Sequence, residues 1–125
     1  MTTSKLKIWG RDLELKIHCR CYEDQEPSPA QQQTLAWFCG AQDVIDSALD
    51  PVKKYILNDE QADASDDPIN NIFYYVMPTT IFVPRDQEKG GIALLCNYRF
   101  DPEHGLAVVF EEQKYKTTGP QDIIL

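Results

Sequence analysis

The stretch KLKIWGRDLELKIHCRCY, residues 5–22, shows the strongest regular pattern in the chain. Apolar and polar residues alternate on both sides of Gly10-Arg11-Asp12, whose glycine and aspartate are typical of a turn. A period of two indicates strands with one face buried, so the stretch predicts a β-hairpin. His18 falls on the polar face and is expected to be exposed. The apolar face of the second strand is expected to hold Leu13, Leu15, Ile17, Cys19 and Cys21.

A helical pattern follows the hairpin and begins at the sequence SPAQ, residues 28–31. Ser28 and Gln31 can form a capping box, in which each side chain accepts a hydrogen bond from the other residue's backbone amide. Pro29 suits the first helical position, because an amide there would have no partner within the helix. Apolar residues then recur at helical spacing, at Leu35, Phe38, Ala41, Ile45, Ala48 and Leu49.

Two residues are expected to interrupt this helix. Gly40 weakens its middle, and Pro51 should kink or restart it near Asp50, which could cap a second piece ending at about Asn58. The sequence NDEQADASDDP, residues 58–68, is acidic and lacks large apolar side chains, so it predicts a loop.

Strand patterns return in the C-terminal half of the chain. NIFYYVMPTTIFVPR, residues 71–85, is rich in aromatic and β-branched residues and predicts a strand interrupted at Pro78. Two further segments predict strands, GIALLCNYRF at 91–100 and GLAVVFEEQKYKT at 105–117, the latter with a turn at Glu112-Gln113.

The order of these elements predicts an α+β fold in a single domain, residues 1–125. We expect an antiparallel sheet with an N-terminal hairpin and C-terminal strands. One long kinked helix or two short helices should cover one face of it. The tail GPQDIIL, residues 119–125, ends on three apolar residues and is expected to dock on the sheet or the helix.

Composition favours a soluble domain. Apolar residues make up 42% of the 125 residues and charged residues 26%, which is ordinary for a globular protein. No apolar run approaches the length of a membrane-spanning helix. The first residues, MTTSKLKIWGRDLEL, lack the apolar core of a secretory signal, so we expect a cytoplasmic protein.

The cysteines favour free thiols in a reducing compartment over a metal site. They make no C-x-x-C pair, and neither histidine joins them at the spacing of a zinc site. We therefore expect neither a metal nor a cofactor. The four cysteines are Cys19, Cys21, Cys39 and Cys96.

The negative charge is concentrated in the middle of the chain. Net charge is −8, and residues 23–70 hold eleven acidic and only two basic side chains. Such a field repels nucleic acid and anionic membranes and attracts basic proteins. The alternative is a solvated helix face whose carboxylates only keep the protein soluble.

The sequence FDPEHG, residues 100–105, carries the densest group of chemically active side chains. As a turn, it needs Pro102 to fix φ, Asp101 to accept amide hydrogen bonds and Gly105 to adopt positive φ. As a site, a carboxylate beside an imidazole could act as a general base or bind a metal. The turn is the favoured interpretation, because no spacing supplies a nucleophile or further ligands. The turn motif comprises Asp101, Pro102, Glu103, His104 and Gly105.

Three sequences resemble a largely uncharacterised family of small bacterial domains with an aromatic/Asp-x-Glu-His-Gly hairpin. They are LLCNYRFDPEHGLAVVF, KYKTTGPQDI and AWFCGAQDVIDSAL, and the resemblance extends from about Leu35 onward. Phe100 replaces the family's usual tryptophan, and Ala107 replaces its second glycine. Several members look like immunity proteins of polymorphic-toxin and contact-dependent inhibition systems. The resemblance therefore implies a toxin inhibitor.

Charge and resemblance together suggest an immunity protein that binds and occludes a cognate basic toxin domain, with a nuclease as the expected class. One alternative is a small hydrolase, metal-dependent or acid/base, centred on Asp101, Glu103 and His104. Another is a small-molecule module lined by Trp9, Trp37, Tyr74 and Tyr75, for which burial in the core is the favoured explanation. The expected partner-binding residues are Tyr22, Glu23, Asp24, Glu26, Tyr55, Asp59, Glu60, Asp63, Asp66 and Asp67.

Overall fold

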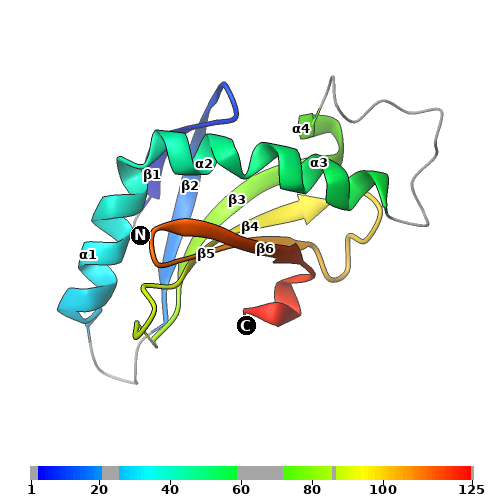
Figure 1. Cartoon of the computed structure of the whole chain (residues 1–125). Helices are drawn as coiled ribbons and strands as arrows, with labels where there is room; N and C mark the ends of the chain where they lie inside the picture. Colours follow the sequence, from blue (N-terminus) through cyan, green and yellow to red (C-terminus); the bar gives the residue numbers. More distant parts are fainter. Residues whose placement is uncertain (1–2, 21–25, 59–71, 86, 125) are drawn as a thin grey trace.

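The computed structural model describes residues 3–20, 26–58, 72–85 and 87–124. They form a six-stranded sheet in the order β1-β2-β3-β4-β5-β6, with the helices packed on one face (Figure 1). The predicted α+β architecture, with its N-terminal hairpin and C-terminal strands, is confirmed. The strands are β1 (Thr3–Ile8), β2 (Arg11–Cys19), β3 (Val76–Val83), β4 (Ile92–Tyr98), β5 (Leu106–Glu111) and β6 (Lys114–Gly119). The helices are α1 (Pro29–Cys39), α2 (Gln42–Ser47), α3 (Leu49–Leu57) and α4 (Ile72–Tyr75), and a 3-10 turn, η1 (Gln121–Ile123), follows β6.

The N-terminal hairpin has a tighter turn than the sequence suggests. The turn is Trp9-Gly10, one residue earlier than the predicted residues 10–12. Both residues have positive φ, 51° and 86°, which suits a two-residue turn between twisted strands. The uncommon conformation of Trp9 is offset by its buried ring and by its Nε1, which donates a hydrogen bond to the Ile45 carbonyl oxygen at 3.0 Å. His18 is exposed, as predicted.

The predicted capping box at the start of α1 is present. Gln31 N donates to Ser28 Oγ at 3.1 Å, and Ser28 N donates to Gln31 Oε1 at 2.9 Å. The buried Gln31 Nε2 also donates to the carbonyl oxygens of Arg20, at 2.8 Å, and Pro84, at 3.1 Å. These two residues lie just beyond the ends of β2 and β3, so one side chain both caps the helix and attaches it to the sheet.

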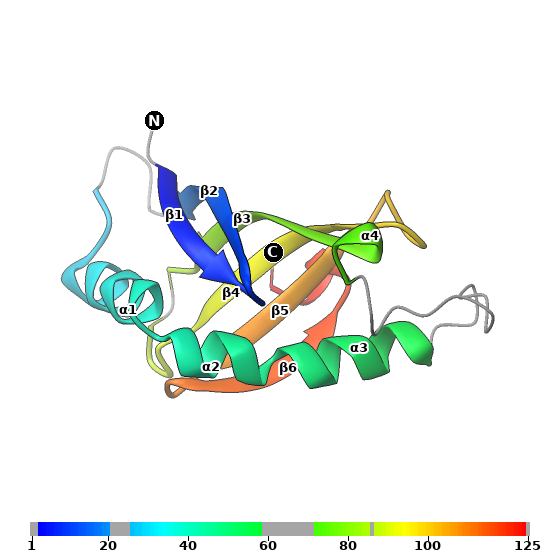
Figure 2. The ribbon, with the colours of Figure 1, turned by 90° about the horizontal axis from the view of Figure 1, so that it is seen from above.

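The helical region is broken close to both positions where an interruption was predicted, although the details differ. Gly40 is the C-terminal cap of α1 and lies outside the helix, and α2 and α3 meet at Ala48. The prediction of an Asp50 cap is wrong, because Asp50 lies in the first turn of α3. Pro51 occupies the same turn, where a missing N–H leaves no helical hydrogen bond unmade. As a result, α2 and α3 run nearly end to end along the sheet (Figure 2).

One strand pair departs from the expected antiparallel pattern. β2 and β3 pair in parallel, from Lys16 with Thr80 to Cys19 with Val83, whereas the other four described pairs are antiparallel. The chain between them includes α1 to α4, and a crossover of this length lets it enter β3 in the same direction as β2.

The sheet buries apolar side chains on both faces. The larger cluster joins the sheet to the helices, and Phe38, Ile45, Val52 and Ile56 are its fully or almost fully buried helical members. β4 and β5 contribute to both clusters, which explains why their sequences are almost continuously apolar. The smaller cluster on the other face contains Phe82, Ala93, Leu95, Ala107 and Val109, with Ile124 of the tail packed against it.

The strand predicted over residues 71–85 is only partly present. Its first part is wrong, because Ile72–Tyr75 forms α4. β3 runs through Pro78, where an interruption was predicted, and the register with β4 shifts between Pro78 and Thr80. The turn predicted within the last strand segment is confirmed. Glu112 and Gln113 have φ of 53° and 62° and form a two-residue turn between β5 and β6.

The helices are short, and α1, with 11 residues, is the longest of those described. Within the described parts of the chain, none is long and apolar enough to cross a membrane.

Candidate functional site

The turn between β4 and β5 contains the predicted Asp-Pro-Glu-His-Gly motif, and its polar groups contact one another. Asp101 Oδ1 accepts a hydrogen bond from His104 N at 3.2 Å, and both Asp101 carboxylate oxygens lie 3.1 Å from His104 Nδ1. Gly105 N donates to the Asp101 carbonyl oxygen at 2.8 Å. The carboxylate and the imidazole therefore stabilise the turn in which they lie.

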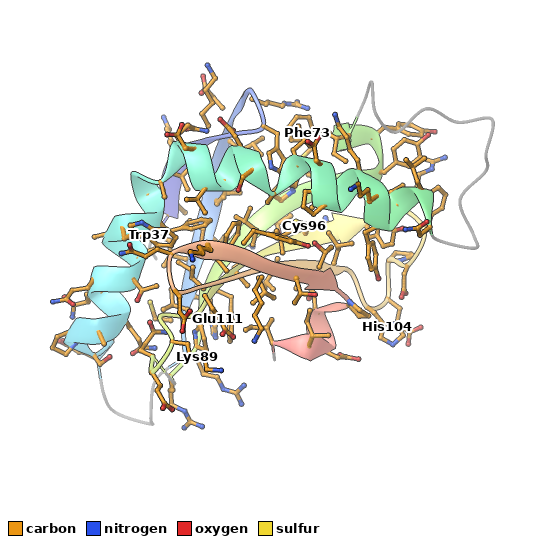
Figure 3. All side chains as sticks on the ribbon, viewed as in Figure 1. Trp37, Phe73, Lys89, Cys96, His104 and Glu111 are labelled. Carbon is orange, nitrogen blue, oxygen red and sulfur yellow. The ribbon has the colours of Figure 1, made fainter. Side chains whose placement is uncertain are left out.

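Gly105 is required here by both conformation and space. Its φ is +63°, and a Cβ at this position would lie 2.5 Å from Gln121 Nε2 and 2.8 Å from the Cys96 carbonyl oxygen. Gln121 Nε2 donates to that same Cys96 oxygen at 3.1 Å, and Gln121 N donates to the His104 carbonyl oxygen at 3.2 Å. The turn thus attaches η1 to the end of β4, and Figure 3 shows His104 beside η1.

The surroundings of His104 raise its pKa, although its side chain is not buried. Its side chain is 48% exposed. The hydrogen bond and the negative charge of Asp101 raise the pKa of His104 above its ordinary value of 6.5. A charged imidazole held by a carboxylate could take up or release a proton near neutral pH. In the part of the chain that the structure describes, no three His, Cys, Asp or Glu side chains gather closely enough to hold a metal ion.

Two of the ten predicted partner-binding residues lie in the described parts of the chain. Glu26 is exposed just before α1. Tyr55 of α3 is half-buried, and its ring centroid lies 6.0 Å from that of Tyr98, so it packs at the edge of the core. The other eight lie outside the described residues: Tyr22, Glu23, Asp24, Asp59, Glu60, Asp63, Asp66 and Asp67.

Sequence reasoning missed a row of carboxylates on the outer face of α2 and α3. Asp43, Asp46 and Asp50 are spaced three and four residues apart and all are exposed. They alternate with Ile45, Ala48 and Val52, which are buried against the sheet. The signal was present, because the apolar spacing that predicted the helix also places these three aspartates on its opposite side. We call Asp43, Asp46 and Asp50 the aspartate row.

The four aromatic residues considered for a small-molecule pocket lie in different surroundings. Trp9 and Tyr75 are buried in the helix-side cluster. Tyr74 is 51% exposed on α4. Trp37 lines a shallow groove between α1 and the turns that contain Lys89 and Glu112. The described residues therefore give these rings no common cavity.

Comparison with known proteins supplies a family. A domain of unknown function, DUF6985, matches residues 2–125, which is nearly the whole chain. No curated protein and no solved structure matches the chain. The chain therefore belongs to the DUF6985 family.

Proposed function

We propose that this protein is a cytoplasmic immunity protein that binds a basic toxin domain through its acidic surface and covers the toxin's active site. The aspartate row is the observation that carries the proposal, because its three carboxylates project from one exposed helical face. The toxin as partner is suggested by the resemblance of the segment around Asp101 to Gly105 to immunity-type domains. A nuclease is the expected class, since enzymes that bind phosphate backbones are basic.

The aspartate row has properties that suit rapid association with such a partner. It is anchored by Ile45, Val52 and Ile56, which are buried against the sheet, so the carboxylates are presented from a rigid support. Complementary charge steers two proteins together and can raise the association rate far above that of neutral surfaces. Inhibition then requires only steric cover of the toxin and no chemistry by the inhibitor.

The proposal is tested by co-expressing the chain with the toxin domain encoded next to its gene. We expect growth to be rescued and a complex to co-elute on a sizing column, with the complex weakened by added salt. Failure to rescue growth, together with separate elution of the two proteins, would count against an immunity role.

A hydrolase at the β4–β5 turn is the second candidate, and the contact between His104 Nδ1 and Asp101 favours it. A carboxylate that orients an imidazole is a common arrangement for a general base. The variant His104→Ala separates the two functions. Toxin binding and growth rescue that survive the substitution, while a hydrolytic activity disappears, would establish the enzyme; the immunity proposal expects no hydrolytic activity to be lost.

A further inference from the structure

Two of the three aromatic rings on the short helix α4, those of Phe73 and Tyr74, each have a guanidinium group lying over them. Arg99 Cζ is 4.1 Å from the centroid of the Tyr74 ring, and Arg11 Cζ is 5.3 Å from that of Phe73. Arg11 begins β2 and Arg99 follows β4, so residues far apart in the sequence both pack on α4, on which Figure 3 labels Phe73. We call Arg11, Phe73, Tyr74 and Arg99 the arginine–aromatic patch.

The patch is exposed, but its support is buried. Tyr74 is 51% exposed, and both arginines are exposed. The Tyr74 ring meets the buried Tyr75 edge to face, with centroids 5.0 Å apart. Arg99 N donates to the Tyr75 carbonyl oxygen at 2.8 Å, which fixes the backbone beneath its side chain.

Phe73 is also held by a ring contact, in this case with Trp9 of the hairpin turn. Its ring centroid lies 6.1 Å from that of Trp9, which is itself hydrogen-bonded through Nε1 to the Ile45 carbonyl oxygen. The rings are therefore preorganised, and a ligand that stacks on them would lose little of its binding energy to ordering them.

The two guanidinium groups retain their capacity to bind an anion. A guanidinium that stacks through its face keeps its N–H donors at the edge, where they match a carboxylate. His104 pairs with Asp101 and Lys116 pairs with Glu111, and neither of these ion pairs involves the patch. In a chain of net charge −8, the patch is thus a cationic and aromatic surface whose arginines are not neutralised by a described carboxylate.

We propose that the arginine–aromatic patch binds a short acidic segment of a partner protein, with carboxylates on Arg11 and Arg99 and an apolar or aromatic side chain on Tyr74. Tyrosine and arginine, together with tryptophan, are enriched among the residues that contribute most to binding at protein interfaces. Nucleic acid is disfavoured, because the net negative charge of the protein repels a polyanion more than a peptide that carries only a few carboxylates. The surface has the opposite charge to the aspartate row, so this inference does not depend on the proposed function.

An array of short synthetic peptides tests it, each peptide carrying two acidic residues and one aromatic residue. Matched peptides carry Asn and Gln in place of Asp and Glu, and the best binder is then measured in solution against the full chain. We expect the double variant Arg11→Ala/Arg99→Ala to weaken binding by about tenfold or more, because two charge-assisted contacts are lost. Arg11→Lys/Arg99→Lys should give a smaller loss, since it keeps the charge but not the planar donor edge.

Two controls show whether a loss of peptide affinity is specific to the arginine–aromatic patch. Arg20→Ala/Lys114→Ala removes two other exposed cations and should leave peptide affinity unchanged. Thermal unfolding of every variant shows whether the fold is retained. The inference would be overturned if acidic peptides bound no better than their amide counterparts. It would also be overturned if Arg11→Ala/Arg99→Ala and Arg20→Ala/Lys114→Ala lost peptide affinity equally. Tighter binding of a single-stranded oligonucleotide to the patch than of any peptide would have the same consequence. Binding of a second copy of the chain at the patch, seen as an increase in mass that Arg11→Ala/Arg99→Ala abolishes, would also overturn it.

Discussion

The β4–β5 turn and the outer face of α2–α3 both present carboxylates to solvent, but their carboxylates make different contacts. In the turn, Asp101 is hydrogen-bonded to the backbone and ring of His104, and the turn as a whole holds η1. On the helices, the aspartate row lies on the exposed side, and among the described residues Gln42 Nε2 donates a hydrogen bond to Asp46 Oδ1 at 3.2 Å. The dense group of reactive residues therefore stabilises a turn, whereas the aspartate row leaves its carboxylates at the surface, where we propose that a partner binds.

Among the substitutions that test this comparison, Gly105→Ala is expected to cause the largest loss of stability. The new Cβ combines unfavourable φ with contacts of 2.5 Å and 2.8 Å, so unfolding free energy should fall by about 2–5 kcal/mol. Gly10→Ala is the matched control, because Gly10 has φ of +86° but nothing within 4 Å of its Cβ position. It should cost about 1–2 kcal/mol. Urea unfolding measures both, and equal losses would show that the packing of the turn against η1 contributes little.

A smaller difference is expected between two aspartates. Asp101→Ala removes the acceptor of the His104 amide and should lower unfolding free energy by about 1–2 kcal/mol. Asp46→Ala, on the helix face, should change it by less than about 0.5 kcal/mol. Thermal or urea unfolding measures the stability of both variants. A larger loss of unfolding free energy in Asp46→Ala than in Asp101→Ala would contradict the comparison.

The smallest effect concerns pH. The pKa of His104 is raised in the folded protein, so the contact with Asp101 stabilises the fold below the unfolded pKa of about 6.5 and this contribution is lost as pH rises through the folded pKa. The difference in melting temperature between the wild-type chain and His104→Gln should therefore be largest under mildly acidic conditions and should disappear at alkaline pH. An NMR titration of His104 should shift to lower pH in Asp101→Asn. A titration midpoint that did not move would exclude Asp101 as the cause.

Much of the fold could be predicted because its signals are local. The alternation at residues 13–19 and the capping box at Ser28 and Gln31 both depend on neighbouring residues, and both are confirmed. The parallel pairing of β2 with β3 depends on the position and direction in which the chain enters β3 after the helical crossover. The second role of Gln31, between the ends of β2 and β3, depends on the same tertiary arrangement, so no local pattern indicated either.

The candidate surfaces were harder to predict for two different reasons. The aspartate row follows from helical spacing and is predictable from the sequence, but the segments around Glu23 and Asp63 hold their acidic residues closer together and give the stronger charge signal. The arginine–aromatic patch could not have been found in this way, because Arg11 and Phe73 become neighbours only when the hairpin and α4 meet at one end of the sheet.

The central claim is that the aspartate row is the surface that binds a basic partner. The most direct test is the dissociation constant of the complex between this chain and the toxin domain encoded next to its gene. The variant Asp43→Asn/Asp46→Asn/Asp50→Asn is compared with Asp12→Asn/Glu103→Gln/Glu112→Gln, which changes net charge equally at exposed positions elsewhere. We predict that neutralising the row weakens binding by about tenfold or more at low salt, and that the control changes it by less than about twofold. Equal affinity losses for the two triple variants, or no loss for either, would contradict the claim.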